Sequence, residues 1–308
     1  MVLIIIIIIL ILAALGGLFA AYYKVFYSPH KGDDEINMPV VNGIKPYYDE
    51  ILRQTKQLSQ IPCQHVFTRS FDGLRLSGRY YRRSENAPLC ICFHGYRGSA
   101  LHDFSVMGQF LLNEGYNVLL VDERAHFKSG GHTITYGVRE RRDVLSWVDY
   151  AGRRFGSDTP VYLFGISMGA ATVLMSSELE LPDNVRAICA DCPYSSPKDI
   201  ICHVAEKTHT NPKIAWPVVW LSGLIYGRLN LNGSVTAAKA VKNTTKPVLL
   251  IHGEADDFVP AEMSEEIRQA NPGRVERYTF PGADHGLSYF ADPDRYISIL
   301  RDFLRRNP

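Results

Sequence analysis

VYLFGISMG, residues 161–169, joins an apolar, β-prone run to a G-x-S-x-G sequence, and small residues then open an apolar helical pattern. This order predicts a strand, a sharp turn and a helix. We expect Ser167, at the tip of the turn, to adopt a strained backbone conformation, because only glycines on either side let the strand and the helix pass closely. The turn would lift the serine hydroxyl clear of the sheet, near the positive end of the helix.

Outward from this stretch, short apolar runs alternate with helical patterns. Predicted strands cover residues 89–93, 117–121, 160–164, 185–190, 247–251 and 275–280, and predicted helices lie near 47–60, 103–113 and 140–153, after Ser167, and from 261 and 295. Apolar strands separated by helices are typical of a parallel sheet covered on both faces. Alternating runs at 65–69 and 74–81, split by Asp72-Gly73, predict an antiparallel hairpin. The predicted fold class is α/β, a mostly parallel, doubly covered sheet with an N-terminal hairpin.

The length and the charge of the chain limit the number of domains and the kinds of partner. The 308 residues suffice for one large α/β domain with a substantial core, or for two small ones. Lys and Arg number 33 and Asp and Glu 32, a formal net charge of +1 with no dense basic run. This balance argues against nucleic acid as a partner. The sequence leaves the oligomeric state open.

The N-terminus predicts a membrane partner. Residues 1–23 carry no charged side chain and, as a helix, would be about as long as a bilayer core is thick. We interpret them as a transmembrane anchor. A signal peptide is the competing interpretation, although the basic n-region it needs is missing. Lys24 and Lys31 follow the segment and favour a cytoplasmic main domain. Residues 24–46 then form a tether and residues 47–308 the main domain.

The six cysteines predict neither disulfides nor a metal site. Cys90 and Cys92 lie in an apolar run that reads as a buried strand. Cys189 and Cys192 have CxxC spacing, but no second pair or histidine cluster accompanies them at zinc spacing. We therefore expect free thiols throughout and no cofactor or metal.

Polar and glycine-rich residues follow the predicted strands, at the sheet edge where α/β proteins carry their chemistry. A serine nucleophile needs a general base, and the base needs an orienting carboxylate. His285 stands in such a loop, in PGADHGLS. Asp191 and Asp256 both follow strands between the serine and this histidine, while alternation would point the adjacent Asp257 elsewhere. The residues alone leave the choice of aspartate open.

The developing oxyanion needs hydrogen-bond donors as well. The residue after the nucleophile, Met168, offers one backbone N–H, and the loop after the first parallel strand offers another at Tyr96, in His94-Gly95-Tyr96.

A long insertion, residues 193–246, separates the fourth and fifth parallel strands. It contains an almost entirely apolar stretch in which Trp216 and Trp220, four residues apart, would share one helix face. It forms either an ordinary packing helix or a small helical cap over the site. As a cap, its aromatic lining would bind substrate and favour acyl or aromatic groups.

HGYRGS, VDERAHFKSGG, GISMG, IHGEADDFVP and GADHG, in this order, resemble the α/β-hydrolase superfamily, and more narrowly its serine-aminopeptidase-like, esterase-type bacterial branch, whose members often follow an N-terminal membrane anchor. The resemblance covers residues 60–306. It implies Ser167 as nucleophile, His285 as base and Asp256 as acid, and it is the main reason to prefer Asp256. It also implies Tyr96 and Met168 as oxyanion donors. Ala125-His126-Phe127 departs from the glycine-rich turn that relatives often have.

The expected function is a serine hydrolase that cleaves carboxylic esters of small or medium apolar acids through an acyl-enzyme. An aminopeptidase, amidase or thioesterase with the same triad is an alternative, as is a non-catalytic binding protein on the same fold. An aminopeptidase would need an acidic group in the insertion to hold the substrate amine, where only Asp199 and Glu206 are available. Ser167 disfavours a dehalogenase, which uses a carboxylate nucleophile.

Overall fold

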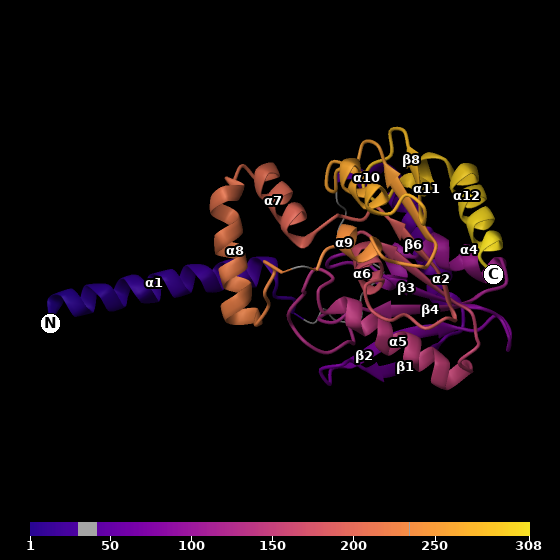
Figure 1. Ribbon diagram of the computed structural model, residues 1–308, viewed down its shortest axis with the longest axis horizontal. Helices are drawn as coiled ribbons and strands as arrows, with labels where there is room; N and C mark the ends of the chain where they lie inside the picture. Colours follow the sequence, from indigo (N-terminus) through magenta and orange to yellow (C-terminus); the bar gives the residue numbers. More distant parts are fainter. Residues whose placement is uncertain (30–41, 234) are drawn as a thin grey trace.

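The computed structural model describes residues 1–29, 42–233 and 235–308, and its centre is one eight-stranded sheet (Figure 1). The strands are β1 (Gln64–Arg69), β2 (Arg75–Tyr81), β3 (Leu89–Phe93), β4 (Asn117–Asp122), β5 (Val161–Ile166), β6 (Val185–Asp191), β7 (Val248–Gly253) and β8 (Val275–Phe280). Their order in the sheet is β1-β2-β4-β3-β5-β6-β7-β8. β1 and β2 pair antiparallel, β2 pairs antiparallel with β4, and all the other pairs are parallel. The predicted fold class is confirmed.

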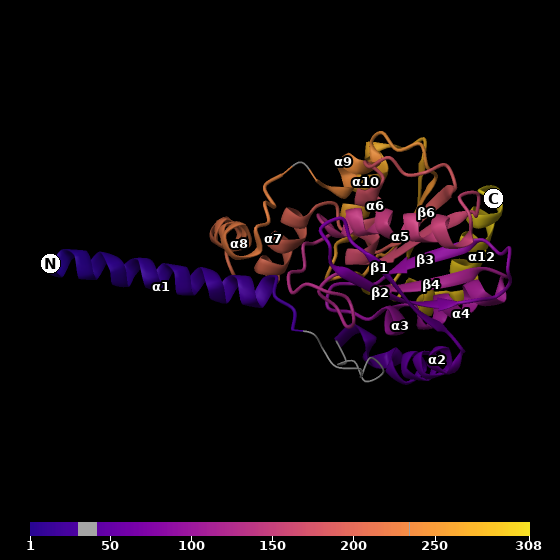
Figure 2. The same ribbon diagram turned by 90° about the horizontal axis from the view of Figure 1, so that it is seen from below.

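Helices cover both faces of the sheet (Figures 1 and 2). One face packs against α5 (Glu140–Phe155), α6 (Met168–Ser176), α9 (Ala237–Val241) and α10 (Ala261–Ala270), and the other against α2 (Tyr48–Gln60), α3 (Ala100–Asp103), α4 (Ser105–Asn113) and α12 (Pro293–Arg306). Because side chains alternate along a strand, Ile91 of β3 joins the first layer while Cys90 and Cys92 join the second. All six cysteines are free, as the sequence predicts.

The strand-to-helix turn after β5 is possible only without side chains at its two glycines. A Cβ at Gly169 would overlap the carbonyl of Phe93 on β3, and one at Gly165 would overlap the carbonyl of Gly169. Ser167 between them has φ 55° and ψ −114°, in the positive-φ region that residues with side chains rarely adopt. The register of the sheet sets Phe93 beside Gly165 and Ile166 beside Asp191, so the loops after β3, β5 and β6 converge.

The insertion at 193–246 is helical, as predicted, and consists of α7 (Pro197–Lys207), α8 (Pro212–Gly227) and the short α9. α9 packs on the sheet layer, since Ala237 and Val241 belong to the core. α8 instead lies against α1 (Val2–Val25), and α7 packs on α8, on the same side of the molecule (Figures 1 and 2).

α1 is long and apolar enough to cross a membrane, a property that signal sequences share. It ends two residues beyond the predicted span, and the chain after it is packed rather than loose. Phe26 is fully buried, and Tyr27 pairs with Thr133 across an isolated β-bridge. The first residues of the predicted tether at 24–46 thus pack on the domain, held by the buried Phe26 ring and the bridge at Tyr27, while the domain boundaries stay a prediction. Residues 30–41 of that tether lie outside the described residues, and η1 (Asn42–Tyr47) precedes α2.

The glycine requirement at the turn gives the first prediction. We expect Gly169→Ala to destabilise the protein by at least about 3 kcal/mol, because the methyl group collides with backbone that cannot rotate away. The control is Gly152→Ala within α5, where a Cβ meets nothing closer than 4.0 Å, and which should be neutral or stabilising by up to about 1 kcal/mol. Urea unfolding of the purified full-length variants measures both. Equal midpoints for the two variants would contradict this account.

Candidate active site

A chain of hydrogen bonds joins three side chains at the carboxyl edge of the sheet. The turn after β5 presents Ser167, the loop after β7 presents Asp256, and the loop after β8 presents His285. His285 Nε2 lies 2.9 Å from the Ser167 hydroxyl oxygen, and its Nδ1 lies 2.7 Å from Asp256 Oδ2. Ser167 is only 7% exposed, so little solvent competes for these bonds. The arrangement can withdraw a proton from the serine hydroxyl.

Asp256 is held ionised in a buried position. Burial by itself would raise the pKa of Asp256, but hydrogen bonds from His252 and His285 and from the backbone N–H of Val259 lower it well below its usual value. Oδ1 accepts from the N–H groups of Phe258 and Val259 at 3.0 and 2.8 Å. His252 Nε2 lies 3.3 Å from Oδ2 and 2.8 Å from the Val259 carbonyl. The carboxylate therefore keeps both its charge and its direction.

The other two candidate aspartates make different contacts. Asp191 is buried and accepts a hydrogen bond from the hydroxyl of Tyr296 at 2.9 Å. Burial raises the pKa of Asp191 to about 6. Asp257 is exposed and forms an ion pair with Lys207 of α7. Of the three aspartates, Asp256 is the one whose carboxylate is hydrogen-bonded to His285.

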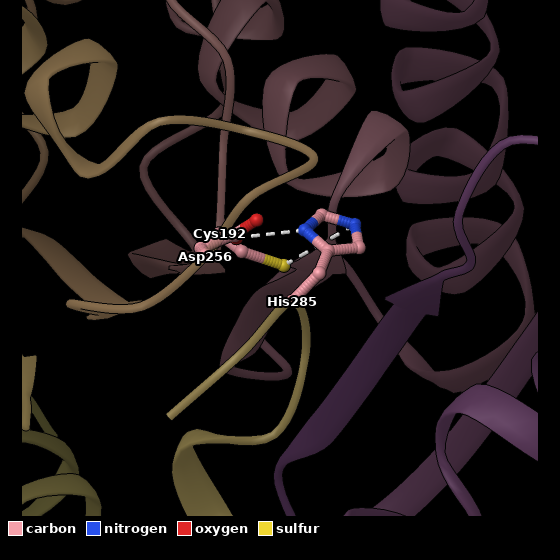
Figure 3. A group of neighbouring side chains, drawn as sticks. All are labelled: Cys192, Asp256 and His285. Atoms are coloured by element: carbon pink, nitrogen blue, oxygen red, sulfur yellow. Dashed lines mark hydrogen bonds and ion pairs between the residues drawn. The ribbon is translucent and has the colours of Figure 1, made fainter. Parts of the chain in front are cut away.

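Cys192 also faces the His285 ring, as Figure 3 shows. Its Sγ lies 3.9 Å from His285 Nε2, a full ångström longer than the serine contact. Burial, with the nearby charges of Asp191 and Asp256, raises the pKa of Cys192 well above its usual value. Ligand atoms of Cys192, Asp256 and His285 lie within 4.8 Å of one another, close enough to share a metal ion. A thiol that resists ionisation is a poor metal ligand, and both ring nitrogens of His285 already have hydrogen-bond partners.

The loop after β3 lies directly against the serine. A Cβ at Gly95 would sit 3.4 Å from the Ser167 Cβ. The Gly95 N–H donates to Asp103 Oδ2 at 2.8 Å, and the Gly95 carbonyl accepts from the Gly98 N–H at 3.0 Å. These bonds fix the turn of the loop that leads into Tyr96.

Two buried histidines, His94 and His126, hold the loop after β3 in place through hydrogen bonds. His94 Nε2 accepts from the Glu123 N–H, and His126 Nε2 accepts from the Arg97 N–H, each at 3.0 Å. A ring nitrogen that accepts is unprotonated, so each Nδ1 carries the proton and donates to the carbonyl of Gly95 or Arg124. Burial, with the neighbouring His94, lowers the pKa of His126 well below its usual value. Sequence reasoning noted His126 only as a departure from the glycine-rich turn and missed this role, whose one signal was a histidine where a glycine is usual.

The two predicted oxyanion donors belong to the two segments that adjoin Ser167, the start of α6 and the loop after β3. Met168 is the first residue of α6, where a backbone N–H has no acceptor within the helix. Tyr96 follows Gly95, and among the hydrogen bonds described for residues 42–233 none uses its N–H or that of Met168. The Tyr96 side chain points away from the site, with its hydroxyl donating to the carbonyl of Val25 at 2.8 Å.

The two predicted substrate-binding tryptophans lie on α8. Both are half-buried and pack against the core from the α7–α8 side. The Trp216 ring lies 5.7 Å from the Lys198 ammonium, and Trp220 donates its indole N–H to Asn230 at 3.0 Å. Binding of substrate by these rings stays a prediction.

A mostly parallel sheet with a serine at a strand-to-helix turn, and later loops that carry an aspartate and a histidine in that order, defines an α/β-hydrolase. Residues 24–278 match the family described as X-Pro dipeptidyl-peptidase (S15 family), and the chain belongs to this family.

The individual relatives have low sequence identity to this chain, but the matches extend over most of its length. The Bacillus subtilis protein YqkD is 24% identical over 296 residues, which cover 94% of this chain and 92% of that protein. The bifunctional esterase/perhydrolase DCH of Acinetobacter calcoaceticus is 24% identical over 246 residues, or 66% of this chain and 86% of the relative. The structure of the Pyrococcus furiosus esterase Pf2001 superposes with a TM-score of 0.63 at 26% identity, covering 82% of this chain and 94% of that one.

Asp191 makes stability depend on pH. Its pKa is about 6 in the folded protein, whereas an aspartate in an unfolded chain titrates near 4, so the folded state binds the proton more tightly. The free energy of unfolding should therefore fall as pH rises from about 4 to about 6, by roughly 3 kcal/mol from this group. Asp191→Asn removes the titration while keeping an acceptor for Tyr296. Thermal midpoints of variant and wild type should separate, in favour of the variant, between pH 4 and pH 7. A constant difference across this range would contradict the assignment.

Proposed function

We propose that this hydrolase cleaves carboxylic esters with Ser167 as nucleophile, His285 as general base and Asp256 as the orienting acid. The observation that carries the proposal is the continuous hydrogen-bonded path from the Ser167 hydroxyl through the imidazole to an ionised, buried carboxylate. A neutral hydroxyl attacks an ester slowly, and removal of its proton during attack is what this path supplies.

The reaction proceeds in two halves. Asp256 accepts a hydrogen bond from the N–H at His285 Nδ1, which leaves the Nε2 lone pair directed at the Ser167 hydroxyl. Serine Oγ attacks the ester carbonyl, His285 takes its proton, and the tetrahedral oxyanion accepts hydrogen bonds from the N–H groups of Tyr96 and Met168. His285 then protonates the leaving alcohol. Water attacks the resulting acyl-enzyme in the same manner and regenerates the serine.

We prefer esters over peptides as substrates because of the acidic side chains that the insertion contains. A peptidase that trims from the amino end must hold a charged amine with a carboxylate. Asp199, at the start of α7, accepts from the hydroxyl of Ser196 at its own helix end, and Glu206 is exposed. The relatives DCH and Pf2001 are named as esterases, and this supports the same choice. Since the family is described by an X-Pro peptidase, cleavage of X-Pro peptides is the second candidate.

We also propose that α1 is retained as a membrane anchor rather than cleaved as a signal peptide. Its end is built into the folded domain: Tyr22 is buried and bonded to Thr133, and the carbonyls of Lys24 and Val25 accept from Arg97 and Tyr96. A leader removed after translocation would leave these donors without acceptors. The natural partners are then a small acyl substrate and the lipid bilayer.

Turnover of p-nitrophenyl esters from acetate to laurate by full-length protein in detergent tests the triad. Relative to wild type, kcat/KM should fall by about 10⁴-fold or more in Ser167→Ala and by about 10³ to 10⁴-fold in Asp256→Asn, because the latter loses the ionised partner of the imidazole. Asp191→Asn is the matched control at a neighbouring buried carboxyl, and should lose less than about tenfold.

Labelling by a fluorophosphonate separates the alternatives. Wild type should be labelled and Ser167→Ala should not. Equal losses in Asp191→Asn and Asp256→Asn would refute the assignment of the acid. A labelled wild type that ignores every ester but hydrolyses an X-Pro dipeptide amide would favour the peptidase, and a folded wild type that is neither labelled nor active would favour a binding protein.

A further inference from the structure

α8 carries an apolar surface that no other described part of the fold covers. Ile214, Val218, Leu221 and Ile225 recur at spacings of four, three and four, so they form one stripe along the helix. These side chains, with Leu224, are between 36% and 65% exposed. We call this set of five residues the outer stripe. Large exposed apolar patches on a folded protein mark a surface that meets another apolar partner.

The opposite face of α8 packs on α1. Gly223 and Gly227 form a small-xxx-small pair, and a Cβ at either would meet the ring of Phe26 or Tyr22 at 3.1 to 3.3 Å. Small residues at this spacing allow two helices to approach closely, as in membrane-embedded pairs. Figures 1 and 2 show α8 lying across α1 rather than alongside it. If α1 crosses a bilayer, α8 runs along the membrane plane.

The contacts also set the depth of α8. The Tyr226 hydroxyl donates to the carbonyl of Leu15, and the Tyr226 ring lies 5.3 Å from that of Phe19. Leu15 is ten residues before the end of α1, or about 15 Å along the helix axis. A helix of this length spans a hydrocarbon core of about 30 Å, so Leu15 lies well inside that layer. The C-terminal half of α8 therefore cannot remain in water while α1 is in the membrane.

We propose that α8 is a second membrane element, an interfacial helix whose outer stripe is immersed in the lipid bilayer beside α1. Three features favour lipid as the occupant. The stripe lies on a helix that crosses the exposed, apolar α1, α8 contains no acidic residue, and its ends carry Lys213 and Arg228, which suit anionic headgroups. A second copy of the chain could cover the stripe but would leave unexplained the depth at which α8 meets α1.

This placement brings the membrane to the active site. Tyr96, the proposed oxyanion donor, and Arg97 beside it donate hydrogen bonds to the carbonyls of Val25 and Lys24 at the end of α1, at 2.8 and 2.9 Å. α7, which connects the site to α8, contacts the Asp256 loop through the ion pair of Lys207 with Asp257. The substrate class that fits, given the proposed esterase function, is an acyl ester that partitions into the bilayer and enters beside α8.

Spin labels on the full-length protein test the position of α8 independently of any activity. Cys63 and Cys202, the two thiols that are not buried, are replaced by serine. One cysteine is then introduced at Val218 or Leu221, with Ile9 of α1 as the lipid reference and Arg305 of α12, at the opposite end of the molecule, as the water reference (Figure 1). The labelled protein is reconstituted in phosphatidylcholine vesicles containing phosphatidylglycerol.

Collision with oxygen and with a water-soluble nickel chelate gives the expected result. Labels at 218 and 221 should favour oxygen, as the label at 9 does, while the label at 305 favours the chelate. Labels at 218 and 221 that behave like 305 would overturn the proposal. So would spin–spin broadening at 218, which indicates a second copy of the chain, and so would a water-exposed label at 9, which indicates that α1 does not span.

An activity comparison tests the substrate class. Val218→Asp/Leu221→Asp should slow hydrolysis of a long-chain diacylglycerol in these vesicles by about tenfold or more, and leave p-nitrophenyl acetate within about twofold. Equal effects on both esters would overturn bilayer entry. A wild type inactive on every ester refutes the esterase proposal and with it the substrate class, while the spin-label result on α8 still stands.

Discussion

The structure depends on the contact between three segments of bare backbone where β5 turns into α6. Gly165 and Gly169 have no side chains there, and the start of α6 therefore packs directly against the carbonyl of Phe93 at the end of β3. That approach forces Ser167 into its positive-φ conformation and brings the loop that follows β3 against the serine. The proposed nucleophile and the loop of the proposed oxyanion donor are thus positioned by one steric requirement.

The polar groups around this turn favour the ionised form of Asp256 over that of its neighbours. Asp256 stays ionised because four donors surround it, whereas burial pushes the neighbouring Asp191 and Cys192 toward their neutral forms. His94 and His126 accept hydrogen bonds and so remain uncharged beneath the loop. Asp256 is therefore the stronger acid of the two carboxyls, and the positive charge that His285 would acquire is stabilised by the carboxylate that it contacts directly.

Most strands could be predicted from the sequence to within one or two residues, because their apolar runs are bounded by glycine and proline and leave no alternative period. The positive φ of Ser167 followed from its flanking glycines. Other features depend on contacts between distant residues. Asp191 differs from Asp256 through a bond to Tyr296, 105 residues later, and the packing of Phe26 depends on a loop near Thr133. Neither contact leaves a local pattern, and the same holds for the docking of α8 on α1.

The hydrogen bonds between the end of α1 and the loop of Tyr96 bear on how the protein should be prepared. A version truncated at the start of the main domain for convenience of expression would strip the acceptors from the Tyr96 hydroxyl and the Arg97 guanidinium. Both side chains are only partly buried and would hydrogen-bond to water instead, so the truncation removes packing and fixed contacts from the segment that leads to Ser167. Low turnover by such a fragment would therefore reflect the lost contacts with α1. Protein purified with this helix, in detergent or nanodiscs, is the sound starting material.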